Sequence, residues 1–309
     1  MTFGGLWIGQ VAMGALMNIA FAFAVGAALL AAWLAKDAQA KVAPARPAWL
    51  RAQRSMQTSA IVLVLADLVW LLYAAASMGG VSLPAALGVV PTVLVQTHVG
   101  YAWSLAFGGA VLLLLTSLAS HTGMLRNALL WLAVIAVAAG KASLGHAADA
   151  GAASPAVGLQ TLHVLTASVW GGLVLASGFA VLPALGASVA RGVLIRTAAQ
   201  VSSVSLVALV FVLLSGVLNA VRGSGGSFAA IDQTTWGHLL ILKLALVALA
   251  VVLGGLNRFS ALPRLRRTAS TMDAHTFANL LYLEAMAMIG VFAAAAVLAD
   301  SVPGFVAAG

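Results

Sequence analysis

The chain has 309 residues, of which 63% are hydrophobic and only 7% are charged, and its formal net charge is +8. Soluble domains carry about 25% charged residues, so this composition excludes a water-soluble fold. It also excludes nucleic-acid binding, which needs a basic face on a folded domain. Because the chain has no cysteine, disulfides, thiolate metal sites and iron–sulfur clusters are excluded as well.

Eight long apolar runs follow one another along the chain. A helix that spans a bilayer needs about 20 consecutive apolar residues, and runs of that kind lie at about 6–34, 56–77, 92–118, 128–145, 157–182, 201–221, 236–256 and 277–298. A short interfacial helix is possible between the second and third runs, in a loop that contains Pro84 and Pro91. The pattern predicts an all-α polytopic membrane protein with a single transmembrane domain over 1–309.

The basic residues are distributed unevenly between the two sides of this arrangement. Of the 15 Lys and Arg residues, Lys141 and Arg222 lie on one side and Lys243 lies within a helix, which leaves 12 in the connections on the other side. Cytoplasmic loops carry an excess of Lys and Arg. The distribution therefore predicts that both the N-terminus and the C-terminus lie outside.

Three ionisable residues fall inside the predicted helices: Asp67, Lys243 and Glu284. Each costs about 2.5–3.5 kcal/mol to insert, so such residues usually face the bundle interior and have a function. Their positions along the second, seventh and eighth helices allow all three to meet in the middle third of the membrane. They predict either a buried ion pair that holds these helices together or a polar step in a cation or proton route.

Four histidines lie in the outer third of four different helices: His98, His146, His163 and His238. A lone histidine is most often bound to a backbone carbonyl, but four at one depth favour a binding site. Neutral imidazole binds copper and other transition metals, and it is also an axial ligand of haem.

Methionine adds a soft ligand that suits Cu(I). Met13 and Met17 are four residues apart on the first helix, so they share a face. Methionine is also a common packing residue, and a packing role is the more frequent explanation for such a pair.

Enzyme motifs are missing from the sequence. It has no HExxH, GxSxG or GxxxxGK[ST] pattern and no glycine-rich dinucleotide motif after a strand. We therefore expect a protein that is not an enzyme and that does not pump with ATP on its own.

Four stretches together resemble the CopD family of bacterial copper-resistance membrane proteins. They are 144–148 (LGHAA), 162–173 (LHVLTASVWGGL), 239–243 (LLILK) with its continuation at 256–259 (LNRF), and 283–284 (LE). The helix that ends in Asn-Arg, with Pro263 shortly after it, is the most specific of these. The resemblance is clearest over 196–298 and extends more weakly back to about Pro91.

The resemblance implies an inner-membrane protein of about eight helices that moves or hands over copper between periplasm and cytoplasm, beside a periplasmic copper-binding partner. His98 and His238 match the family pattern less well than the other residues. The residues that match it are His146, His163, Trp170, Lys243, Asn257, Arg258 and Glu284.

These considerations lead to one main hypothesis. His146 and His163, with His98 or His238 and with Met13 or Met17, form an outer copper site. A path below that site is then lined or gated by a set of five residues: Lys243, Glu284, Asp67, Trp170 and Asn257.

Two alternatives remain open. One is a membrane cytochrome in which paired histidines hold b-type haem and exchange electrons with a periplasmic copper protein. The other is an assembly subunit that binds no metal and docks a periplasmic copper chaperone.

Overall fold

The computed structural model describes residues 4–39, 43–119, 123–151, 154–227, 231–302 and 306. Within these ranges the chain is helical and contains no strand, and eight helices are long and apolar enough to cross a membrane. This confirms the all-α, multi-pass class. The long helices are α1 (Gly5–Ala38), α2 (Arg46–Gly79), α4 (His98–Leu118), α5 (Met124–Leu144), α6 (Pro155–Ala176), α7 (Arg191–Gly223), α9 (Thr235–Leu256) and α11 (Thr271–Ala299).

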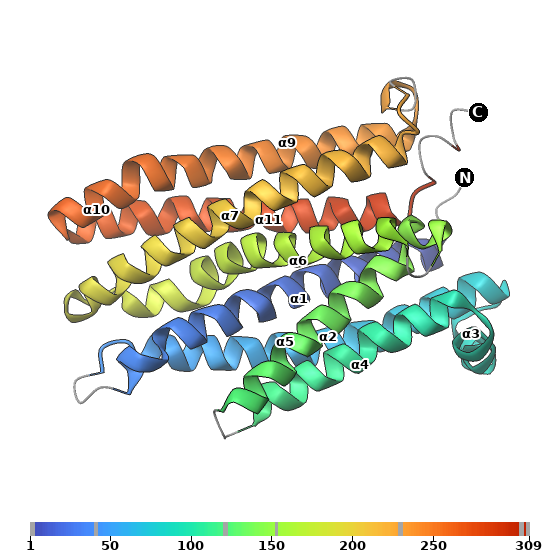
Figure 1. Ribbon diagram of the computed structural model, residues 1–309, viewed down its shortest axis with the longest axis horizontal. Coiled ribbons are helices and arrows are strands. Elements are labelled where there is room, and N and C mark those ends of the chain that lie inside the picture. The colour runs from blue at the N-terminus through green and yellow to red at the C-terminus, as the bar shows by residue number, and fades with distance from the viewer. Residues whose placement is uncertain are drawn as a thin grey trace.

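The first residues of α1 and the last residues of α11 lie at the same end of the bundle (Figure 1). This agrees with an even number of crossings. We call this end the outer end, following the orientation that the basic residues predict. Three short helices also lie on this side: η1 (Leu83–Gly88), α3 (Val90–Gln96) and η2 (His146–Ala150). The possible interfacial helix in the loop after α2 is thus present as η1.

Several predicted helix starts are wrong, since α7 begins at Arg191 rather than near residue 201 and α11 at Thr271 rather than near residue 277. Helix α2 begins at Arg46 rather than near residue 56, because Pro47 occupies its first turn, where proline is tolerated. The predicted helix over 92–118 is split into α3 and α4 at Thr97. The Thr97 hydroxyl accepts a hydrogen bond from the Gly100 amide at 3.1 Å and thereby caps α4.

Two helices contain a wider turn, which lies within the predicted range 157–182 in one of them and carries the other past its predicted end at 256. After α6 a π-helical turn, η3 (Ser177–Val181), leads to Pro183, and after α9 a second one, η6 (Asn257–Ala261), leads to α10 (Leu262–Thr268) with Pro263 in its first turn. Proline has no amide hydrogen and interrupts regular α-helical bonding, and π-turns of this kind often occur at functional sites. The stretch after residue 256 is therefore helical and not an open connection.

Helix α1 lies in the centre of the bundle, where it contacts α2, α6 and α11. Helices α2, α4 and α5 lie on one side of it, whereas α7 and α9 lie toward the opposite edge (Figure 1). The closest approach joins α1 and α6, since a Cβ on Gly172 would overlap the carbonyl oxygen of Ala22. Small residues allow such contacts between membrane helices.

We expect the substitution Gly172→Ala to lower the thermal unfolding temperature of the detergent-purified protein. The added methyl group has no space against the α1 backbone, and overpacking of this kind costs about 1–3 kcal/mol. The matched control is Gly158→Ala on the same helix, where a Cβ meets nothing within 4 Å. The control should not lower the unfolding temperature, because alanine is the better helix former. Equal unfolding temperatures for both variants would contradict the tight α1–α6 contact.

Candidate functional site

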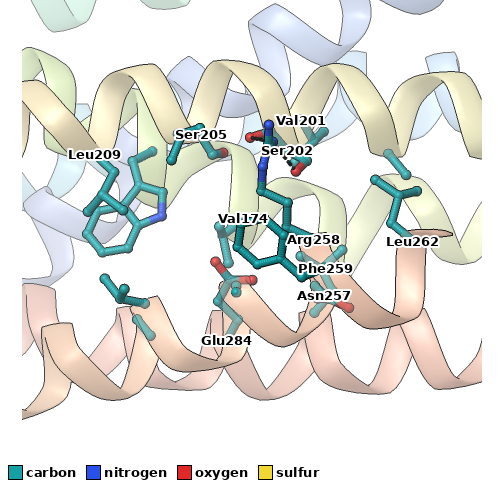
Figure 2. Close-up of a pocket in the computed structure, with 18 of the residues that line it drawn as sticks. Val174, Val201, Ser202, Ser205, Leu209, Asn257, Arg258, Phe259, Leu262 and Glu284 are labelled. Atoms are coloured by element: carbon teal, nitrogen blue, oxygen red, sulfur yellow. Dashed lines mark hydrogen bonds between the residues drawn. The ribbon is translucent and has the colours of Figure 1, made fainter.

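A pocket of ≈ 150 Å³ lies in the C-terminal half of the bundle, between α6, α7, α11 and the junction of α9 with η6. Apolar side chains form most of its wall. Six of its lining residues carry polar groups: Trp170, Ser202, Ser205, Asn257, Arg258 and Glu284. In Figure 2 the carboxyl group of Glu284 projects into the pocket from one wall, and Ser202 and Ser205 lie on the opposite wall.

Glu284 is the charged residue at the centre of this pocket, and only 5% of its surface is exposed. It lies about 20 Å along α11 from the first residue of that helix, taking 1.5 Å per residue, and thus near the middle of the span. Its carboxyl group has the Asn257 amide and the Trp170 indole as side-chain hydrogen-bond partners. A Cβ on Gly254 would lie 2.8 Å from Glu284 Oε1, so this glycine makes the space that the carboxyl group occupies.

The π-turn η6 directs two consecutive polar side chains to different helices. The Asn257 amide, in the orientation that satisfies its hydrogen bonds, donates to Phe277 O at 3.2 Å and accepts from Leu281 N at 3.0 Å. The Arg258 guanidinium donates to Ser202 Oγ at 2.8 Å and to Ser202 O at 3.0 Å. One turn thus connects α9 to α11 through Asn257 and to α7 through Arg258 (Figure 2).

Ser205 lies one helical turn beyond Ser202 on α7 and also lines the pocket. Its hydroxyl oxygen is buried and has no hydrogen-bond partner among the described residues. Buried polar groups are nearly always hydrogen-bonded, so an exception needs an explanation. A ligand that passes through the pocket would find this hydroxyl available opposite the Glu284 carboxyl.

His163 lies on the same face of the bundle as the pocket, closer to the outer end. Its Nδ1 is 2.9 Å from Ser215 Oγ on α7. Ser215 in turn donates its own hydroxyl hydrogen to Phe211 O at 2.6 Å, so Ser215 Oγ accepts from His163 Nδ1–H. The neutral imidazole then keeps a free lone pair on Nε2, which is the form of histidine that binds metals.

A further polar pair lies closer to the outer end. Asn219 donates to Gln160 Oε1 at 2.9 Å, one turn outward of the pair His163 and Ser215. Trp170 lies about 10 Å inward of His163 along α6. These two polar pairs therefore lie between α6 and α7, on the outer side of the pocket.

The three ionisable residues of the predicted helices do not meet, which corrects our expectation. Lys243 acts electrostatically on His163 and lies 11 residues outward of Gly254, about 16 Å along α9. Asp67 lies on α2, which has no substantial contact with α9 or α11 among the described residues; its charged neighbour is Lys141 on α5. The sequence predicts depth along each helix but not which helices are neighbours.

The structure also separates the outer histidines. His98 is exposed on α4 and His238 is exposed on α9, and these helices lie at opposite edges of the bundle (Figure 1). His238 Nε2 donates to Asp232 O at 2.9 Å, which is the common backbone contact. In the described part of the chain no three His, Cys, Asp or Glu residues form a group that could hold a metal. A common site for all four histidines is therefore not formed.

His146 begins η2, which packs against both α5 and α6; its side chain lies outside the described part, so its role stays a prediction.

Met17 is only 1% exposed and belongs to the core, whereas Met13 is half-buried. Met17 lies nine residues before Gly26, and His163 lies nine residues before Gly172. Nine residues are two and a half turns, so both side chains face away from the α1–α6 contact. This placement favours packing for Met17.

Sequence reasoning missed the polar residues of α7. Ser202 and Ser205 are three residues apart, and Ser215 and Asn219 are four apart, so each pair shares a helix face. This spacing is the feature of the sequence that could have identified these residues. Serine also occurs where membrane helices simply pack closely, so the pattern alone does not distinguish a polar path from a contact.

Comparison with known proteins links both halves of the chain to copper resistance. The family model "Copper resistance protein D" matches residues 195–298, and the model "Copper resistance protein D-like, N-terminal domain" matches residues 5–155. A segment of 60 residues is 45% identical to the inner membrane protein YebZ of Escherichia coli (strain K12), and it spans 19% of this chain and 20% of that protein. No solved structure matches the chain.

Proposed function

Because the chain belongs to the family of copper resistance protein D, which two family models match over 5–155 and 195–298, we propose that it transports copper across the bacterial inner membrane and contributes to copper resistance and homeostasis. The inner-membrane location agrees with the relative that carries this description and with eight membrane-spanning helices. Copper is the cargo in this proposal, and the protein acts without enzymatic chemistry.

The observation that carries the proposal is the presence of polar groups at His163 and, further inward, around Glu284. The hydrogen bond to Ser215 holds His163 in the tautomer that leaves Nε2 free, and histidine nitrogen is a good copper ligand. His146 starts η2 next to α6. We propose that these two histidines receive the ion at the outer end.

Below the histidines the path continues to the pocket around Glu284. The Glu284 carboxyl group supplies the negative charge that a metal cation needs in the low-dielectric interior, and Asn257, Trp170 and the Ser205 hydroxyl provide polar groups around it. Lys243 acts on His163, so its positive charge opposes the entry of a cation and gates the step between the histidines and the pocket.

A periplasmic copper-binding protein is the proposed donor of the ion. The outer end of the bundle carries the folded segments η1, α3 and η2, of which η2 packs against α6. The protein lacks cysteine, so transfer would take place onto histidine rather than thiolate.

Metal analysis and an absorption spectrum of the purified protein test this function. We expect about one copper ion per chain after incubation with copper and dialysis, with no Soret band. A Soret band would instead support the b-type haem cytochrome. Protein that retains no copper would support the assembly subunit that docks a copper chaperone.

A further inference from the structure

A second buried acid lies in the N-terminal half of the bundle, away from the proposed copper path. Asp67 on α2 is 0% exposed, and neither of its carboxylate oxygens has a hydrogen-bond partner among the described residues. A carboxylate that is buried without such partners is strongly disfavoured in its charged form. Ionisable groups within membrane helices occur mainly where ions or protons bind.

The packing of α4 and α5 brings one cation near this acid. The Trp103 indole of α4 donates to Asp67 O at 3.0 Å, which fixes α4 against α2 at this level. One turn further along α4, a Cβ on Gly140 of α5 would overlap the backbone nitrogen of Ala106. The next residue is Lys141, which is half-buried and acts electrostatically on Asp67.

The surroundings of Asp67 contain few other titratable groups. The elements η1, α3, η3 and η4 (Leu182–Leu185) have none, α1 has only Lys36 and Asp37 at its inner end, and α4 has only His98 and Tyr101 at its outer end. Arg126 lies at the inner end of α5, and α2 itself carries Arg46, Arg51 and Arg54 at its inner end and Tyr73 near its outer end. Among these described groups, Lys141 is therefore the cation that acts electrostatically on the Asp67 carboxyl group.

A purely structural role explains Asp67 poorly. A buried charge stabilises a protein only when hydrogen bonds satisfy its polar atoms, and the Asp67 carboxylate has none among the described residues. Asp67 and Lys141 are connected to the copper path by direct packing, because α5 contacts α6, and α2 contacts η3 and η4, which follow α6. A change of charge at Asp67 can reach the path through α1, which contacts both sides.

We propose that Asp67 is a proton-binding site whose carboxyl group takes up and releases one proton in each transport cycle. One carboxylate oxygen of Asp67 binds the proton, which leaves a neutral acid near the Lys141 cation. Release of the proton restores the carboxylate. Proton binding at Asp67 does not depend on copper transport, whereas the coupling of this proton to copper movement rests on the function proposed above.

Infrared spectroscopy of the purified full chain tests the proton site without any transport. Difference spectra between acidic and alkaline buffer should contain a band of a protonated carboxylic acid that shifts in heavy water and disappears in Asp67→Asn. Glu284→Gln identifies the contribution of the other buried acid, and Asp232→Asn, which changes an exposed acid, is the matched control. A spectrum of Asp67→Asn identical to that of the wild type would overturn the proposal.

Liposomes that contain the protein and a pH-sensitive dye test the coupling. With wild-type protein, copper entry should be accompanied by a change of internal pH, and with Asp67→Asn this change should fall to the level of protein-free vesicles. The variant Asp67→Asn/Lys141→Met removes both charges and should behave in the same way even if the single variant folds poorly. A wild-type pH change in both variants would overturn the coupling. Wild-type vesicles that take up no copper would contradict the proposed function, and the infrared result would still decide the proton site.

Discussion

Replacing Glu284 with glutamine is expected to lower copper flux into liposomes about a hundredfold, because losing one charged partner in a buried site costs about 3 kcal/mol. Glutamine has nearly the same size and can still bond Asn257 and Trp170, which flank the carboxyl group. The loss would therefore reflect the missing charge rather than a changed shape. Copper uptake per reconstituted protein is the measurement, with the unfolding temperature as the check on folding.

Two further variants make the Glu284 prediction specific. Glu284→Asp keeps the charge and should retain part of the flux. Gly254→Ala places a methyl group against Glu284 Oε1 and should lower the flux although it changes no polar group. Wild-type flux in folded Glu284→Gln would show that copper does not pass this carboxyl group.

Replacing both His146 and His163 with alanine is expected to remove the copper that the purified protein retains. The two imidazoles are the proposed ligands at the outer end, and no cysteine is present to replace them. The measurement is the number of copper ions per chain by metal analysis. His98→Ala/His238→Ala is the matched control, because both of these histidines are exposed and lie at opposite edges of the bundle.

Removing the hydrogen bond between His163 and Ser215 should weaken copper binding less than removing both histidines. Ser215→Ala removes the group that fixes the His163 tautomer, and losing such an outer partner weakens metal binding about 10- to 100-fold. Ser203→Ala changes an exposed serine on the same helix and should leave the affinity unchanged. Undiminished copper in the double histidine variant would contradict the outer site.

Hydropathy and charge predicted the class and the number of spans, because a bilayer requires about 20 apolar residues per helix. Helix ends were less predictable where proline was involved. Pro47 lies inside the first turn of α2, and the stretch around Pro263 continues the helix through the π-turn η6. Proline marks an interruption of regular bonding, but the sequence does not say whether the helix resumes after it.

The sequence predicted the depth of Glu284 and His163 in the membrane but not which residues of other helices surround them. Depth follows from the rise of 1.5 Å per residue, whereas lateral position depends on which helices pack together. Depth alone therefore predicts that Asp67 can meet Lys243, although α2 and α9 have no substantial contact in the described part of the chain. Ser215 and Ser205 were missed because serine is common on helix contacts, and only the hydrogen bond of Ser215 to His163 and the pocket around Ser205 distinguish them.

Copper uptake by liposomes that contain the purified wild-type protein tests the central claim most directly. The proposed path through His163 and Glu284 predicts that copper accumulates inside with time, saturates with external copper and stops in Glu284→Gln. Uptake no faster than in protein-free liposomes would contradict transport by this chain.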